Sequence, residues 1–187
     1  MRVIIPNSKI ILKTLVLFYL LYFASQILSA QDFYQFTQVD YLKNVNIAFH
    51  EAGHTLFALF GDFLRTLGGS FLQVFLPLML AVYFFIWRKE TFSGGVMLFW
   101  VAESIIDVSW YIADAQKTLL PLLGNPNGGR AGHDWHYLLN TLGVLDKTDA
   151  IAGAVFLLAG LVFLCAFLAM LYSIYLDFAK SSNFYRR

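Results

Sequence analysis

The chain has 187 residues, of which 59% are hydrophobic, 18% aromatic and only 13% charged. About a quarter of an ordinary soluble domain is charged, so most of this chain is expected to lie in a lipid bilayer. The net charge is +1 and the sequence has no polybasic or acidic run, which argues against nucleic acid as a partner.

Four apolar stretches are long enough to cross about 30 Å of hydrocarbon as helices, which takes roughly 20 residues each. Helix is the expected conformation, because backbone groups in lipid must be paired within the segment. The expected spans are about 10–30, 70–87, 92–114 and 150–177. The fold class is therefore predicted to be all-α, a polytopic transmembrane helix bundle that forms one integral-membrane domain over residues 1–187.

Two segments between these spans carry all the histidines. The first is predicted to be a helix over about 41–67 that contains HEAGH at His50 to His54 and is stopped by Gly68-Gly69. This helix is nearly long enough to cross the bilayer, so it either lies against the membrane or spans it. The second, residues 116–149, is rich in turn formers and then reads HDWH in a short segment of helical periodicity.

The distribution of basic residues favours the alternative in which the HEAGH helix does not span. With four spans and a cytoplasmic amino terminus, the positive-inside rule is satisfied by Arg88, Lys89, Lys180, Arg186 and Arg187. Both termini are then cytoplasmic, and both histidine-bearing segments lie on the outer face. The expected location is the cytoplasmic (inner) membrane of a bacterium.

The HEAGH motif predicts a metal site. His50 and His54 lie one turn apart on one helix face, where both imidazoles can bind one metal ion, and Glu51 can reach a water bound to it. Zn²⁺ lowers the pKa of such a water and polarises a carbonyl, while the carboxylate accepts the proton. We therefore expect two zinc ligands and a general base here. The alternative is a polar helix face solvated at the membrane edge.

A catalytic zinc usually has a third protein ligand. The four-span topology brings Asp114, at the outer end of the third span, and His133 closest to HEAGH, so these two are the predicted choices. Asp134 and His136 are expected to orient a ligand imidazole or to cap a helix.

Two further acids, Glu103 and Asp107, lie on the same face of the third span as Asp114. They are expected either to form hydrogen bonds between helices or to act as alternative ligands or partners of a ligand. Glu103 becomes the better third ligand if the HEAGH helix spans.

A polar interruption, Gly69, Ser70 and Gln73, separates the HEAGH helix from the second span. A substrate backbone could approach closely at such a place. The commoner structure for such a sequence is a tight turn between helices with Ser70 as the N-cap.

HEAGH together with an acid on a later span resembles the integral-membrane zinc metallopeptidases of the site-2 protease kind, which hold zinc with HExxH on a membrane helix and a distant aspartate. The Asp-Gly pair in which those enzymes usually carry the aspartate is absent from this sequence. Over most of its length the chain is similar to small bacterial membrane proteins that share HEAGH, a GGS…Q…P segment and a later HDW.

The function expected from HEAGH and from this resemblance is a membrane-embedded zinc-dependent hydrolase, a metalloprotease acting on a membrane protein or peptide. One alternative keeps the zinc but attacks a lipid amide or ester. Another is a non-enzymatic metal-binding subunit of a larger membrane complex, favoured because 187 residues leave no room for a separate substrate-binding domain.

Overall fold

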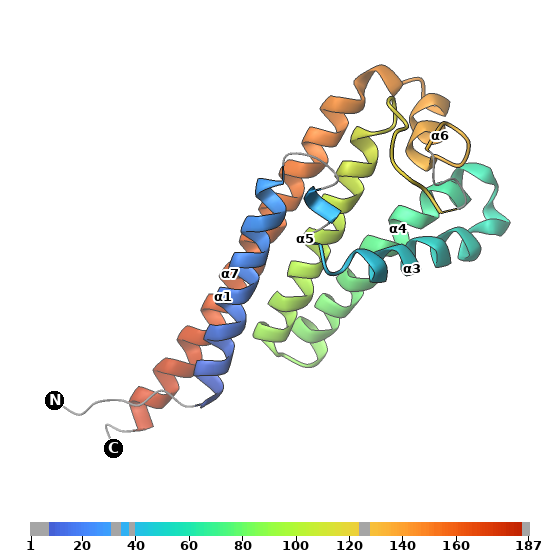
Figure 1. The fold of residues 1–187 in the computed structure, drawn as a ribbon. Helices are drawn as coiled ribbons and strands as arrows, with labels where there is room; N and C mark the ends of the chain where they lie inside the picture. Colours follow the sequence, from blue (N-terminus) through green and yellow to red (C-terminus); the bar gives the residue numbers. More distant parts are fainter. Residues whose placement is uncertain (1–7, 31–34, 38–39, 124–127, 185–187) are drawn as a thin grey trace.

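The computed structural model describes residues 8–30, 35–37, 40–123 and 128–184, and in this part of the chain the fold is an all-α bundle without a β-strand (Figure 1). The predicted fold class is confirmed. Helices long and apolar enough to cross a membrane are α1 (Ser8–Ser29), α4 (Asp62–Val82) with its π-helical continuation η2 (Tyr83–Trp87), α5 (Thr91–Ala113) and α7 (Thr148–Phe184).

The HEAGH helix, α3 (Lys43–Leu56), is shorter than the predicted 41–67. Its 14 residues span about 21 Å, too short to cross a bilayer, and Figure 1 shows it lying across the bundle at a steep angle to α1, α5 and α7. α3 is therefore not among the helices long enough to span, which favours the non-spanning alternative.

A turn after α3 explains the difference in helix length. The 3-10 turn η1 (Ala58–Phe60) is followed by Gly61, whose φ of 87° lies in the left-handed region that glycine enters without a Cβ clash. α4 then begins at Asp62 rather than at 70, with an acidic residue in its first turn. Gly68 and Gly69 lie inside α4, so the prediction that they stop the HEAGH helix is wrong.

These glycines instead let α3 and α4 touch. A Cβ added at Gly53 of α3 would lie 2.1 Å from the carbonyl oxygen of Gly68, a distance at which no side chain fits. Small residues at a crossing allow two backbones to approach closely, which is the usual way in which membrane helices associate. The close crossing brings the histidine face of α3 down onto α4.

α5 is the most buried helix, and residues 101–109 are all buried. Phe99 packs against Phe163 of α7 with ring centroids 5.0 Å apart. Near the middle of α5, Glu103 accepts hydrogen bonds from Nδ2 of Asn46 at 3.0 and 2.9 Å, which joins α5 to the start of α3. Glu103 therefore forms hydrogen bonds between helices, which is one of the two roles predicted for it.

The helix ends form two groups (Figure 1). The start of α1, the α4–α5 connection and the end of α7 lie at one end of the bundle, where Nζ of Lys13 donates to Asp177 at 2.6 Å. The start of α4, the end of α5 and the start of α7 lie at the other end. That end also carries α6 (Asp134–Thr141) and the 3-10 turn η3 (Leu145–Lys147), both within the predicted 116–149 segment. HEAGH and HDWH therefore meet at the same end, as the four-span topology requires.

Candidate metal centre

His50 and His54 point from α3 toward the same place above α4. Their rings are edge to face, with centroids 4.8 Å apart and an interplanar angle of 81°. Gly69 of α4 lies directly beneath them, since a Cβ added there would be 2.6 Å from Nε2 of His50 and 2.7 Å from Cε1 of His54. Only glycine leaves room for the two imidazoles at this position.

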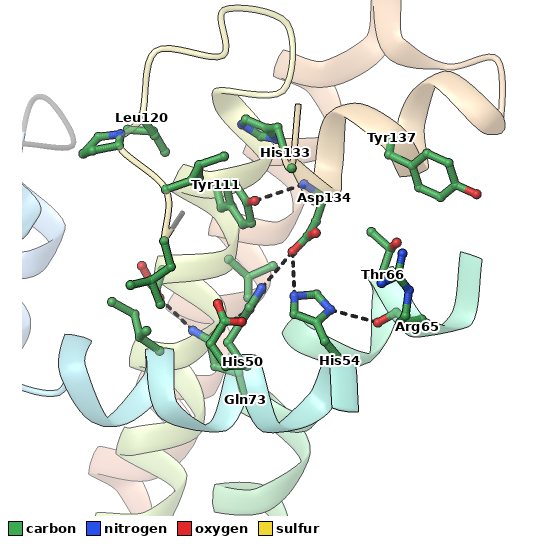
Figure 2. A pocket seen from close by; sticks show the side chains of 18 of the residues that line it. His50, His54, Arg65, Thr66, Gln73, Tyr111, Leu120, His133, Asp134 and Tyr137 are labelled. Carbon is green, nitrogen blue, oxygen red and sulfur yellow. Dashed lines mark hydrogen bonds and ion pairs between the residues drawn. The ribbon is translucent and has the colours of Figure 1, made fainter. Parts of the chain in front are cut away.

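The third member of the cluster is Asp134, the first residue of α6. Its Oδ2 lies 2.8 Å from Nε2 of His50 and 3.2 Å from Nε2 of His54 (Figure 2). Ligand atoms of these three residues all lie within 4.8 Å of one another, and the described residues contain no other such group of three or more His, Cys, Asp or Glu side chains. Asp114 and His133, the predicted third ligands, are not part of the group.

Both imidazoles have their other ring nitrogen bound to an oxygen acceptor. Nδ1 of His50 lies 3.1 Å from Oε1 of Gln73, and Nδ1 of His54 lies 2.9 Å from the carbonyl oxygen of Arg65 (Figure 2). The Gln73 amide is oriented in turn, because its Nε2 donates to Asp107 at 2.7 Å. Each Nδ1 therefore carries the hydrogen, and in a neutral imidazole each Nε2 presents a lone pair to Asp134.

Two lone pairs and a carboxylate oxygen in one place need a cation between them. In a tetrahedral zinc site with bonds of 2.0–2.2 Å, neighbouring ligand atoms are about 3.4 Å apart, close to the spacing observed here. The side chains are largely shielded from water, with 12% of His50, 24% of His54 and 14% of Asp134 exposed. The three side chains could therefore hold a metal ion, and two imidazoles with one carboxylate are ligand types that zinc accepts.

The pKa values of His54 and Asp134 indicate that the cluster favours positive charge. The hydrogen bond to Asp134 raises the pKa of His54 to about 9, against the opposing effect of burial. Burial acts to raise the pKa of Asp134, but the hydrogen bonds of the two imidazoles outweigh it and hold that pKa below its usual value. The cluster thus attracts positive charge, which a proton or a metal ion can supply.

The residues predicted to contact substrate lie against the cluster and the helices that carry it. Ser70 is buried in α4 and its Oγ accepts a hydrogen bond from Nε1 of Trp135 at 3.1 Å, which fixes α6 on α4. Gln73 orients His50, and it is also the one residue of the three that lines the neighbouring cavity. Because α4 is continuous through these positions, the helix-helix turn with Ser70 as N-cap does not form.

Asp107 is bound on both sides. It forms an ion pair with Lys43 at the start of α3 and accepts the hydrogen bond of Gln73 from α4. Asp107 therefore acts on His50 through Gln73, which is one of the roles predicted for it. The series of side-chain contacts from Lys43 through Asp107 and Gln73 to His50 joins α3, α4 and α5.

His133 and Asp114 form a pair of their own beside the cluster. Nε2 of His133 lies 3.1 Å from Oδ2 of Asp114. The same carboxylate accepts the backbone N–H of Leu119 at Oδ1 and that of Leu120 at Oδ2. Burial lowers the pKa of His133 despite this carboxylate. Nδ1 of His133 accepts the backbone N–H of His136, so His133 is the N-cap of α6.

Two residues of HDWH make other contacts than the sequence predicted. The capping residue is His133 and the residue that meets the imidazoles is Asp134, because Asp134 is the first residue after the cap. His136 is not part of the cluster, and its Nδ1 lies 2.7 Å from the carbonyl oxygen of Ala115. The periodicity of the segment indicated a short helix, but its cap and its rotation depend on contacts with α4 and with the end of α5.

A cavity of about 900 Å³ opens beside the cluster. His50, His54 and Asp134 line it together with Glu51, whose side chain is exposed. One wall is apolar and includes Leu120, Pro121, Leu122 and Leu123. A substrate in this cavity would reach both the candidate metal position and the Glu51 carboxylate.

Two groups at the site were not predicted from the sequence. The hydroxyl of Tyr111 accepts the backbone N–H of Asp134 at 3.0 Å, and the Arg65 carbonyl binds His54. Tyr111 follows Asp107 by one helical turn on α5, so its position on the acidic face was the available signal. The Arg65 contact is made by backbone and leaves no trace in the sequence.

The chain was compared with protein-family models, with curated proteins and with solved structures, and none of the three comparisons gives a match.

Proposed function

We propose that the protein is a membrane-embedded, zinc-dependent hydrolase that cleaves an amide bond, with His50, His54 and Asp134 as zinc ligands and Glu51 as general base. The observation that carries the proposal is the convergence of two Nε2 atoms on one oxygen of Asp134 while each Nδ1 is bound to its own acceptor. Imidazoles that bind zinc are oriented in this way by hydrogen bonds from the opposite ring nitrogen.

Three protein ligands beside an open cavity favour catalysis over a structural role. Structural zinc sites are closed by four protein ligands, whereas catalytic sites have three and keep one position for water or substrate. Bound zinc would supply Lewis acidity toward a carbonyl and toward water. The cavity of about 900 Å³ is large enough for several residues of a peptide or for an acyl chain.

Glu51 is proposed to transfer the proton between the attacking water and the leaving nitrogen. Its carboxylate accepts a proton as a water oxygen bonds to the carbonyl carbon, and it returns that proton to the nitrogen as the C–N bond breaks. The products are a carboxylic acid and an amine, and no oxidant or further co-reactant is needed. Glu51 suits this role because it adjoins His50 in sequence and lines the same cavity.

The substrate is proposed to be a membrane protein or peptide that reaches the outer face of a bacterial cytoplasmic membrane. The four apolar helices support membrane association. The start of α1, the α4–α5 connection and the end of α7 lie at the end of the bundle opposite the cluster (Figure 1). These segments carry Lys9, Arg88, Lys89 and Lys180, so the positive-inside rule supports cytoplasmic termini and an outward-facing site.

The test is to purify the protein in detergent, measure its zinc content and assay a panel of membrane peptides, lipid amides and lipid esters. We expect wild type to bind one zinc ion and to cleave a peptide of the panel, and Glu51→Gln to keep the zinc and lose cleavage. Equal cleavage by both proteins would exclude Glu51 as the base. Cleavage confined to a lipid would replace the peptide substrate by a lipid while keeping the same centre.

A further inference from the structure

We infer that the hydroxyl of Tyr111 is a second catalytic group, which donates a hydrogen bond to the carbonyl oxygen of the substrate as negative charge develops on it. This inference rests on the proposed hydrolase function and adds a residue of the third span to it. Its basis is the position of one phenol relative to the candidate metal cluster and the cavity.

The phenol is held next to the cluster by a ligand residue itself. Its oxygen accepts the backbone N–H of Asp134 at 3.0 Å, and the Tyr111 ring lies 5.9 Å, centroid to centroid, from the ring of His50 (Figure 2). On its other side the ring packs against His133 with centroids 4.6 Å apart. Contacts on both sides leave the side chain little freedom to turn away.

The proton of this hydroxyl is available. A phenol both donates and accepts, and the bond from Asp134 uses the oxygen only as an acceptor. Within the described part of the chain, the Tyr111 hydroxyl takes part in the bond from Asp134 and donates no hydrogen bond of its own. Since Tyr111 lines the cavity, the proton can be donated to a substrate that lies there.

A donor at this place has a chemical purpose that Glu51 cannot serve. When water adds to a carbonyl, the carbonyl oxygen takes up negative charge, and a fixed donor stabilises that charge more than it stabilises the neutral substrate. Glu51 is a proton acceptor in the same step. Tyr111, on a different helix but in the same cavity, supplies the complementary donor.

Tyr137 provides a matched control. It lines the same cavity, but it is 41% exposed and Figure 2 shows its hydroxyl directed away from His54. Tyr111→Phe and Tyr137→Phe each remove one hydroxyl from the cavity lining. Only the first removes a group fixed beside the cluster.

The experiment measures zinc content, peptide cleavage and binding of a tetrahedral analogue, the phosphinic analogue of acetyl-Leu-Leu-amide, for wild type and both variants. We expect Tyr111→Phe to keep its zinc, to lower kcat about 10²- to 10³-fold with little change in KM, and to bind the phosphinic analogue more weakly by a similar factor. Tyr137→Phe should keep its zinc and its kcat, and any change in KM or in analogue affinity should be much smaller than the loss of analogue affinity in Tyr111→Phe.

The outcomes separate the inference from the proposed function. Unchanged cleavage and unchanged analogue affinity in Tyr111→Phe would overturn the role of Tyr111 and leave the hydrolase intact. Loss of zinc from Tyr111→Phe would also overturn it, because the hydroxyl would then only position Asp134. If wild type cleaves nothing, the proposed function fails. The analogue still decides on Tyr111 in that case, and equal affinities of wild type and variant, including no binding by either, would exclude the contact.

Discussion

Gly69 of α4 lies so close to His50 of α3 that a Cβ added to the glycine would be 2.6 Å from Nε2 of the imidazole. The same atom would be 2.7 Å from Cε1 of His54. The helix crossing therefore determines where the two imidazoles can be, and a single methyl group at position 69 would move them.

Gly69→Ala is expected to lower zinc affinity by about tenfold or more, which corresponds to about 1.4 kcal/mol. The reason is that the methyl group displaces the Nε2 atoms from the position they share with Asp134. Zinc affinity can be measured by competition with a chromophoric chelator. Gly160→Ala in α7 is the control, because nothing lies within 4 Å of a Cβ added there. Wild-type zinc affinity in Gly69→Ala would contradict the contact.

Asp134→Asn is expected to lower zinc affinity more than Asp114→Asn does. Asp134 offers an oxygen at 2.8 and 3.2 Å from the two Nε2 atoms, whereas Asp114 is bound to His133 and to the backbone after α5. We expect a loss of more than about a hundredfold for Asp134→Asn and less than about tenfold for Asp114→Asn. The reverse order would restore the ligand assignment predicted from the sequence.

Much of the fold could be predicted from the sequence because it depends on short-range patterns. Hydropathy over about 20 residues located the four spans to within a few residues at most ends, and the four-residue spacing placed His50 and His54 on one face. The start of α4 was misplaced because Gly68-Gly69 has two uses, as a helix stop and as a helix-crossing site. These two uses of the glycine pair can be told apart only from the surface of α3 that packs against it.

The third member of the candidate metal cluster, Asp134, could not be predicted for a related reason. HDWH contains three residues able to bind zinc, and the one that reaches the cluster depends on how α6 is rotated. That rotation is set by the bond of His133 to Asp114 and by that of Trp135 to Ser70. Both join segments far apart in the chain, so no local periodicity contains them.

Gln73→Leu is expected to lower zinc affinity about 10- to 100-fold without removing a ligand. The substitution deletes the acceptor of the His50 Nδ1–H and frees the ring to turn. Gln116→Leu is the matched control, since Gln116 is exposed and bonds only to the backbone of Leu145 in the described structure. Equal zinc affinity of Gln73→Leu and Gln116→Leu would show that Gln73 does not orient the imidazole.

Cysteine labelling should place the site outside the cytoplasm. Cys165 is the sole cysteine of the chain, so a Cys165→Ala background gives a protein without thiols. In this background, Asn140→Cys on α6 should react with a membrane-impermeant maleimide added to intact spheroplasts, whereas Lys89→Cys should react only after lysis. Both positions are exposed in the structure. Reaction of Lys89→Cys alone in intact spheroplasts would reverse the orientation.

The most direct measurement is the zinc content of the purified, detergent-solubilised protein by mass spectrometry under native conditions. One zinc ion per chain is predicted for wild type and for Glu51→Gln, and none for the His50→Ala/His54→Ala double variant, because two of the three proposed ligands are then gone. A folded wild-type protein that binds no zinc after incubation with it, or a double variant that binds as much as wild type, would contradict the metal centre.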